Sequence, residues 1–117
     1  MKNLVFILVF LQLSSHCLDG KILNEFTQSK EVEYFNIKQF IFIENGYLDY
    51  FENIKQQKAI IIISKDKVTD KKYFEIYKIT KEKDNVKKVF IRYQHLNAYF
   101  ILECTPDSLL NIESGQS

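Results

Sequence analysis

Apolar residues follow two different patterns along the chain. Near the start, eight of them run without interruption from Leu4 to Leu11, shortly after the single positive charge of Lys2. From residue 34 onward they occur in short runs rich in β-branched and aromatic side chains, separated by turn-forming residues. The first pattern is typical of a secretory signal sequence, and the second predicts a series of β-strands.

The short runs predict five or six strands joined by tight turns. Asn45-Gly46 is the dipeptide best suited to a two-residue hairpin, because such a turn needs positive φ at both positions. Strands joined by short turns pair antiparallel, since parallel neighbours require long crossover connections. We therefore expect an antiparallel meander built from the runs 34–44, 47–51, 59–63, 73–80, 86–93 and 98–104.

The two ends of this region carry weaker patterns. Residues 18–33 are polar, with a few apolar residues near helical spacing, and fit either a tether or a short helix. At the other end, Thr105-Pro106-Asp107-Ser108 resembles the start of a helix, with a cap residue, a proline and an early acid. The expected fold class is mainly β, with a β-rich α+β fold as the alternative and short terminal helical segments. The expected organisation is a signal sequence at 1–17, the tether or short helix at 18–33, and a single strand-rich domain at 34–117.

The apolar stretch near the start is too short to cross a bilayer, which takes about 20 residues in a helix. It is followed by Leu13-Ser14-Ser15-His16-Cys17. The leucine and serines before a cysteine resemble a bacterial lipoprotein signal, although His16 stands where Gly, Ala or Ser is usual. The resemblance implies cleavage before Cys17 and lipid attachment to it. The alternatives are plain secretion after a cut before Leu18, and retention of the segment. We expect export, with the protein either secreted or lipid-anchored in the cell envelope.

The charge balance argues against a nucleic-acid partner. Without residues 1–17 the chain has 15 basic and 15 acidic residues, whereas dedicated polyanion binders are strongly basic. Lysines concentrate between residues 55 and 93, mainly at expected turns, where they keep strand edges soluble. The run Lys87–Tyr93 mixes basic and aromatic residues as RNA-binding strands do, but it lacks their glycines. We expect no nucleic acid among the partners.

Few residues are candidates for catalytic, cofactor or metal chemistry. Without residues 1–17, His95 is the sole histidine, and it falls at an expected hairpin. Cys104 alternates with apolar residues on a strand, where burial raises the pKa of a thiol and leaves it inert. One histidine and at most two cysteines form no zinc-binding spacing, and three glycines form no phosphate-binding loop. We expect no catalytic, cofactor or metal site and no enzymatic activity.

The remaining candidate for function is a binding surface. Tyrosine is common at interfaces because it offers a large rigid face with a polar tip. The candidate contact residues are Tyr47, Tyr50, Lys71, Lys72, Tyr73 and Tyr77. We expect a non-enzymatic domain that binds an unidentified protein at the cell envelope or outside the cell, with a membrane tether if Cys17 carries lipid. The alternatives are a carrier that holds a small apolar ligand inside a curled sheet, and a secreted enzyme of unknown type.

Overall fold

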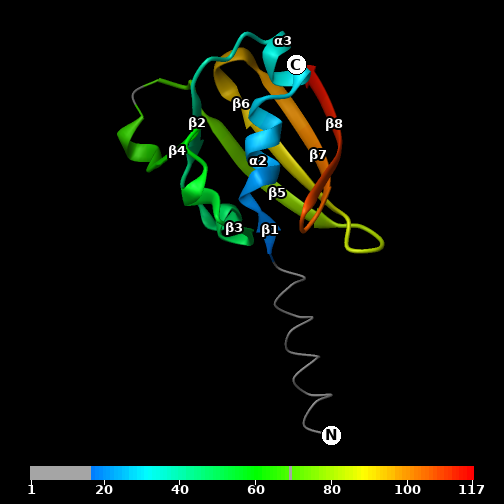
Figure 1. Ribbon diagram of the computed structural model, residues 1–117. Coiled ribbons are helices and arrows are strands. Elements are labelled where there is room, and N and C mark those ends of the chain that lie inside the picture. The colour runs from blue at the N-terminus through cyan, green and yellow to red at the C-terminus, as the bar shows by residue number, and fades with distance from the viewer. Residues whose placement is uncertain (1–16, 69) are drawn as a thin grey trace, which may run out of the picture.

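A six-stranded sheet with a helix across one face forms the body of the protein (Figure 1). The computed structural model describes residues 17–68 and 70–117, so residues 1–16 of the signal sequence expected at 1–17 lie outside the described residues. Two helices open the chain, α2 (Gly20–Thr27) and α3 (Lys30–Tyr34). The sheet has the strand order β4 (Ile60–Ile63), β2 (Phe40–Ile43), β5 (Phe74–Lys81), β6 (Lys87–Tyr93), β7 (Ala98–Thr105) and β8 (Ser108–Gln116).

Local side-chain bonds explain why the segment at 18–33, left open by the sequence, becomes helical. The Asp19 carboxylate accepts a hydrogen bond from the N–H of Lys21 at 3.0 Å and so caps α2. Ser29 caps α3 in the same way through the N–H of Val32. Burial then selects the face of α2 that meets the sheet, because Ile22, Leu23 and Phe26 are fully buried on it.

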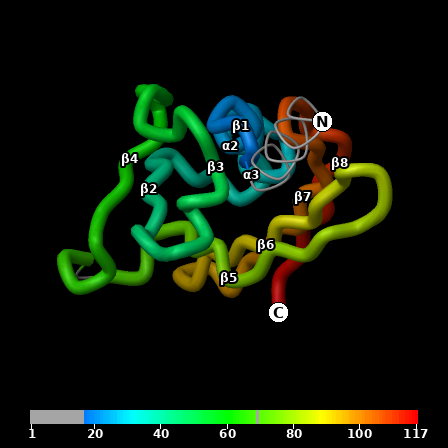
Figure 2. The backbone as a smooth tube through the Cα atoms, turned by 90° about the horizontal axis from the view of Figure 1, so that it is seen from below, coloured from blue at the N-terminus to red at the C-terminus, as the bar shows by residue number. Residues whose placement is uncertain are grey.

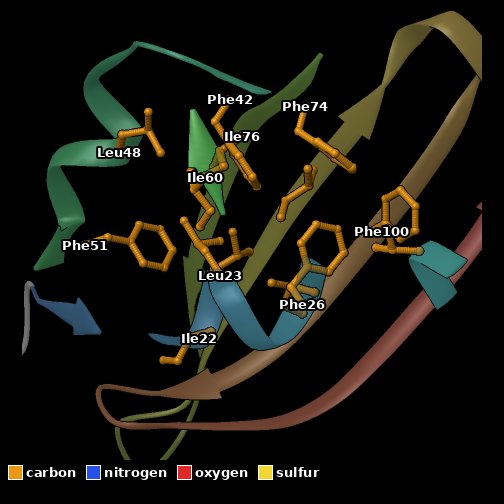
Figure 3. Packing of buried hydrophobic residues seen from close by; sticks show 14 of the residues in the cluster. Ile22, Leu23, Phe26, Phe42, Leu48, Phe51, Ile60, Phe74, Ile76 and Phe100 are labelled. Carbon is orange, nitrogen blue, oxygen red and sulfur yellow. The ribbon is translucent and has the colours of Figure 1, made fainter. Parts of the chain in front are cut away.

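The core lies between α2 and the sheet. Phe26 of α2 meets Phe74 and Phe100 of the sheet edge-on, with ring centroids 5.5 Å and 5.0 Å apart, a favourable aromatic geometry. Figure 3 shows Leu23 and Phe26 of α2 on the side of the helix that faces the sheet residues Phe74, Ile76 and Phe100. The inward side of the sheet is therefore filled by the chain's own side chains.

The sheet is mixed, which confirms the mainly β class but corrects the expectation of a wholly antiparallel meander. Strands β5 to β8 do form an antiparallel meander. Strand β2, however, pairs in parallel with both β4 and β5. A long crossover joins β2 to β4, made of the 3₁₀ helix η1 (Gly46–Tyr50), β3 (Phe51–Glu52) and the 3₁₀ helix η2 (Ile54–Gln56).

Asn45-Gly46 begins this crossover and does not form the expected hairpin. Asn45 is extended, with φ −156° and ψ 175°, and its side-chain oxygen accepts a hydrogen bond from the N–H of Tyr47 at 3.0 Å. The asparagine therefore caps η1, a role that its short acceptor side chain suits equally well. Residues 47–51, expected as a returning strand, form most of η1 and the first residue of β3.

The expected C-terminal helix is also absent, because the chain turns back at Pro106 and continues as β8. Thr105 pairs with Ser108 across this turn, and Leu102 pairs with Ile112 farther along. A nine-residue strand satisfies far more backbone groups through its neighbour than one isolated helical turn would.

The N-terminal end of the described chain meets the turn between β7 and β8 at one end of the sheet. Strand β1 (Leu18–Asp19) pairs in parallel with β3, and the two lie side by side in Figure 2. The N–H of Asp19 donates to the C=O of Pro106 at 2.8 Å, and Leu18 is buried. Within the described part of the chain, no helix is long and apolar enough to cross a membrane.

Candidate functional site: a tyrosine-lined hollow

Three of the six candidate contact residues converge on one surface hollow of about 510 Å³. It lies between η1 and β5, and we call it the tyrosine hollow. Its lining residues are Asn45, Gly46, Tyr47, Tyr50, Glu75, Ile76 and Tyr77. The three tyrosines are 37 to 40% exposed, so each offers a ring face to solvent while its base is packed.

A β-bulge places Tyr77 in the hollow. In the β5–β6 ladder Ile76 pairs with Ile91 and Lys78 pairs with Phe90, which leaves Tyr77 as the extra residue. A bulge of this kind re-aims a side chain and interrupts the ladder locally. The alternation of the strand is interrupted here, with Tyr77 and Lys78 both exposed, and the Tyr77 ring packs 6.1 Å from Phe90, centroid to centroid.

Asn45 holds η1 against the same bulge. While its oxygen caps η1, its amide nitrogen donates to the C=O of Ile76 at 3.0 Å. One side chain thus fixes both the helix that carries Tyr47 and the strand that carries Tyr77. The relative position of the two rings depends on this asparagine.

An ion pair closes the hollow on the sheet side. Arg92 donates to one oxygen of Glu75 from Nε at 3.1 Å and from Nη2 at 2.9 Å, and the Lys65 ammonium lies 3.8 Å from the other oxygen. The Glu75 side chain is only 14% exposed, so its charge is compensated by these two cations. Its carboxylate is held in place as part of the wall of the hollow.

Two of the tyrosine rings have cations of the chain itself over their faces. The Arg92 guanidinium lies 5.6 Å from the centre of the Tyr77 ring. The Lys87 ammonium lies 5.6 Å from the centre of the Tyr50 ring. Such contacts are favourable and restrict the rings, so the hollow presents aromatic surfaces that are partly ordered before any partner arrives.

The other three candidate contact residues lie elsewhere. Tyr73 is only 6% exposed and belongs to the core, which rules it out as a contact residue in this structure. Lys71 and Lys72 are exposed on the loop before β5 but do not line the hollow. Sequence reasoning missed Asn45, Glu75 and Arg92, although the cross-strand pairing of the last two follows from the expected 73–80 and 86–93 hairpin once its register is known.

A second hollow, of about 730 Å³, lies on the other side of η1. Its apolar lining comes from the crossover and from β4: Leu48, Phe51, Ile54, Ile60 and Ile62. Glu44, Asp49 and Lys55 contribute charges to its lining. We call it the crossover hollow; it shares Asn45 with the tyrosine hollow.

Neither cysteine is prepared for nucleophilic chemistry. Cys104 is fully buried on β7, and burial raises the pKa of its thiol to about 11. Cys17 is half-buried at the start of β1, where a hydrogen bond to the Glu52 carboxylate, followed by burial, raises the pKa of its thiol. Both thiols are therefore protonated at neutral pH.

His95 is exposed in the 3₁₀ turn η4 (Gln94–Leu96), edge-on to Tyr93 at 6.4 Å. Among the described residues, no three His, Cys, Asp or Glu side chains gather as a metal site would require. No protein-family model, curated protein or solved structure matches this chain.

Proposed function

We propose that this protein is an exported, non-enzymatic domain that binds another protein at the cell envelope or outside the cell through the tyrosine hollow. The observation that carries the proposal is the convergence of Tyr47, Tyr50 and Tyr77, with Arg92 behind them, on one concave surface. Tyrosine and arginine are over-represented among the residues that dominate protein–protein binding energy.

The order of the hollow supports a binding role. Asn45, the Glu75–Arg92 ion pair and the two cation–ring contacts hold the tyrosines in defined positions. A surface whose aromatic side chains are already held in position loses little side-chain entropy on binding. The inward face, by contrast, is packed with Phe26, Phe74 and Phe100, which favours a partner at the surface over a small apolar ligand carried inside the sheet.

The start of the described fold supports processing near Cys17. Leu18 is buried and is the first residue to join a ladder, through its pairing with Phe51. A cut before Cys17 or before Leu18 would therefore remove none of the buried apolar residues described here. If Cys17 carries lipid, the domain begins directly at its membrane anchor.

Catalysis is the less favoured interpretation because the chemically reactive groups are restrained. The pKa values of both thiols are raised, and the Glu75 carboxylate in the hollow is bound by Arg92. A nucleophile needs the opposite conditions, a lowered pKa or an adjacent base.

Photo-crosslinking in the native host tests the binding surface. A photoreactive amino acid replaces Tyr47 or Tyr77 in the tyrosine hollow, and replaces Tyr34 as the control. Tyr34 is 82% exposed and lies on α3, outside the lining of the hollow. We expect a discrete protein adduct from Tyr47 and Tyr77 and none from Tyr34. Equal yields at all three positions, or no adduct at the hollow, would contradict the proposed surface.

Export is tested separately by the intact mass of the protein in the membrane and soluble fractions. A membrane species starting at Cys17 with added acyl chains supports the lipid-anchored form, and a soluble species starting at Leu18 supports free secretion. A full-length mass in the cytoplasm would refute export without affecting the crosslinking result.

A further inference from the structure

Strand β4 is an edge strand whose backbone is available for pairing. Its inner neighbour is β2, and the N–H of Glu44 just beyond β2 donates to the C=O of Ile63 at 2.8 Å. Backbone groups of alternate residues in a strand point to the same side. Ile61 and Ile63 therefore bond to β2, whereas Ile60 and Ile62 direct their N–H and C=O groups away from the sheet.

Few of these outward groups have partners. The N–H of Ile60 donates to the C=O of Gln57 at 3.1 Å. For the N–H and C=O of Ile62, and for the C=O of Ile60, residues 17–68 and 70–117 provide no hydrogen bond. Figure 2 shows β4 at the outer margin of the molecule, with no strand on its far side.

The two edges of the sheet differ in how they are protected. The opposite edge strand, β8, carries Glu113 and a register irregularity opposite Glu103 and Cys104, both common means of preventing edge-to-edge pairing. Strand β4 consists of four isoleucines without a charge, a proline or a bulge, and Ile61 is 49% exposed. An unprotected apolar edge of this type is a template for an additional strand.

The surface beside β4 can also accept side chains. Ile60 and Ile62 line the crossover hollow of about 730 Å³, together with Leu48, Phe51 and Ile54. In strand-addition complexes, backbone bonds provide affinity and pockets for alternate side chains provide specificity. Strand β4 combines the two, because its outward backbone groups can form the bonds and the crossover hollow beside it can take up side chains.

The charges around β4 indicate which chain it pairs with. Lys58 precedes the strand and Lys65 follows it, both exposed. Two antiparallel copies of β4 would bring Lys58 of each copy toward Lys65 of the other, and like charges on facing strands are destabilising. A different polypeptide with acidic residues at both ends of an apolar stretch would instead complement the two lysines.

We propose that β4 is a strand-addition site, which takes up an extended segment of a partner protein with alternating apolar residues flanked by acids. This inference rests on the proposed function, since it specifies the form in which a protein partner binds. The two hollows meet at Asn45, so a segment paired with β4 continues toward the tyrosine hollow.

The test uses the purified mature protein and a pool of fluorescent nine-residue peptides. Each peptide has an acid at both ends and apolar residues alternating with threonine. The tightest binder is identified by fluorescence anisotropy and is then made in two N-methylated forms. One form is methylated at the amides of the odd-numbered residues, and the other at the amides of the even-numbered residues. We expect one set to weaken binding by about tenfold or more, which corresponds to losing one or two hydrogen bonds, and the other set to change it less than about twofold.

A protein variant provides the complementary measurement. Ile62→Pro removes an N–H that faces away from β2, so the ladder within the sheet is kept and proline is tolerated at such an edge. Ile62→Val retains the N–H and is the matched control. We expect Ile62→Pro to lose peptide binding while Ile62→Val keeps it, with both folded by circular dichroism. If Ile62→Pro does not fold, the paired N-methylated peptides still decide the question.

Several results would overturn the inference. These are a pool without a binder below about 1 mM, equal effects of the two methylation patterns, or binding that is abolished by Tyr77→Ala but not by Ile62→Pro. A dimer of the protein that disappears in Ile62→Pro would also overturn it, by making a second copy the occupant. Failure of the crosslinks at Tyr47 and Tyr77 with intact peptide binding would refute the tyrosine hollow and leave the β4 site standing.

Discussion

Gly20→Ala is expected to destabilise the protein although alanine is the better helix former. Gly20 is the first residue of α2, where the helix crosses the start of η2. A Cβ atom at this position would lie 2.8 Å from three backbone atoms, the C and O of Asn53 and the Cα of Ile54. No rotation of a side chain relieves a clash with backbone, so α2 and the crossover must separate.

The size of the effect follows from these distances. Carbon atoms in contact normally lie about 3.5 to 4.0 Å apart, so the helix must retreat by roughly 0.7 Å or more. That movement shifts Ile22, Leu23 and Phe26, which are fully buried. Overpacking of a well-packed core costs about 1–3 kcal/mol, and the gain in helix propensity returns at most about 1 kcal/mol. The net loss therefore lies between about 0 and 3 kcal/mol. Its middle range, about 1–2 kcal/mol, corresponds to roughly 4–16 °C in Tm for a domain of this size.

Gly46→Ala is the matched control, because it adds the same methyl group where nothing lies within 4 Å. Gly46 does not have positive φ, so alanine should be neutral or stabilise by up to about 1 kcal/mol. Urea unfolding of both variants measures the difference in the free energy of unfolding. If Gly20→Ala proves as stable as Gly46→Ala, the close packing of α2 on η2 is wrong.

Two further predictions concern a buried thiol and the residue that organises the tyrosine hollow. The pKa of Cys104 is raised to about 11 from an ordinary value of 9.0, so between these pH values the unfolded chain loses a proton that the folded protein keeps. The free energy of unfolding should therefore fall as pH rises from 9 to 11, by up to about 1.4 kcal/mol per pH unit. Urea unfolding at a series of pH values measures this slope, and Cys104→Val should lack the part that Cys104 contributes. Equal slopes for the wild type and Cys104→Val would contradict the prediction. Asn45→Ala should cost about 1–3 kcal/mol, because it leaves the C=O of Ile76 without its donor, and it should lower the crosslinking yield at Tyr77. Asn45→Asp keeps the cap oxygen but places a charged acceptor beside that C=O, so a loss in this variant belongs to the contact with Ile76 and not to the cap. A wild-type yield in both variants would show that Asn45 does not position the rings.

The antiparallel half of the sheet could be predicted from the sequence, because its pattern is local. Strands β6 and β7 alternate strictly between buried and exposed residues, with Val89, Ile91 and Phe100, among others, facing inward. Short turns join them, so neighbours in sequence are neighbours in space. The expected runs 73–80, 86–93 and 98–104 accordingly lie close to β5, β6 and β7.

The parallel half could not be predicted, because it depends on choices that local sequence leaves open. Asn45-Gly46 suits a hairpin as well as a helix cap, and a contact with Ile76, 31 residues away, accompanies the cap. In the antiparallel half, β8 was missed for a similar reason: Thr105-Pro106 suits a helix start as well as a turn, and pairing of β8 along β7 favours the turn. Tertiary contacts outweigh local propensity at both places.

The same distinction applies to the candidate site. The tyrosines are visible in the sequence, and three of them do meet at one hollow. The bulge at Tyr77 and the hydrogen bond from Asn45 bring them together, and no pattern in the neighbouring sequence predicts either feature. Tyr73, four positions before Tyr77, is buried instead; it lies in the bend just before β5, outside the alternation of the strand.

The contact between β1 and the turn that joins β7 to β8 has a consequence for biosynthesis. Asp19 is bonded to Pro106, and Phe26 packs on Phe100 as well as on Phe74, so the first helix lacks part of its partner surface until the last two strands have been made. A nascent chain that stops short of β7 buries Phe26 incompletely. Such a chain stays open while it is being synthesised, since contacts between distant residues form late. Under the proposed export this order is an advantage, because a polypeptide that has not yet closed its core can still be threaded through a translocation channel.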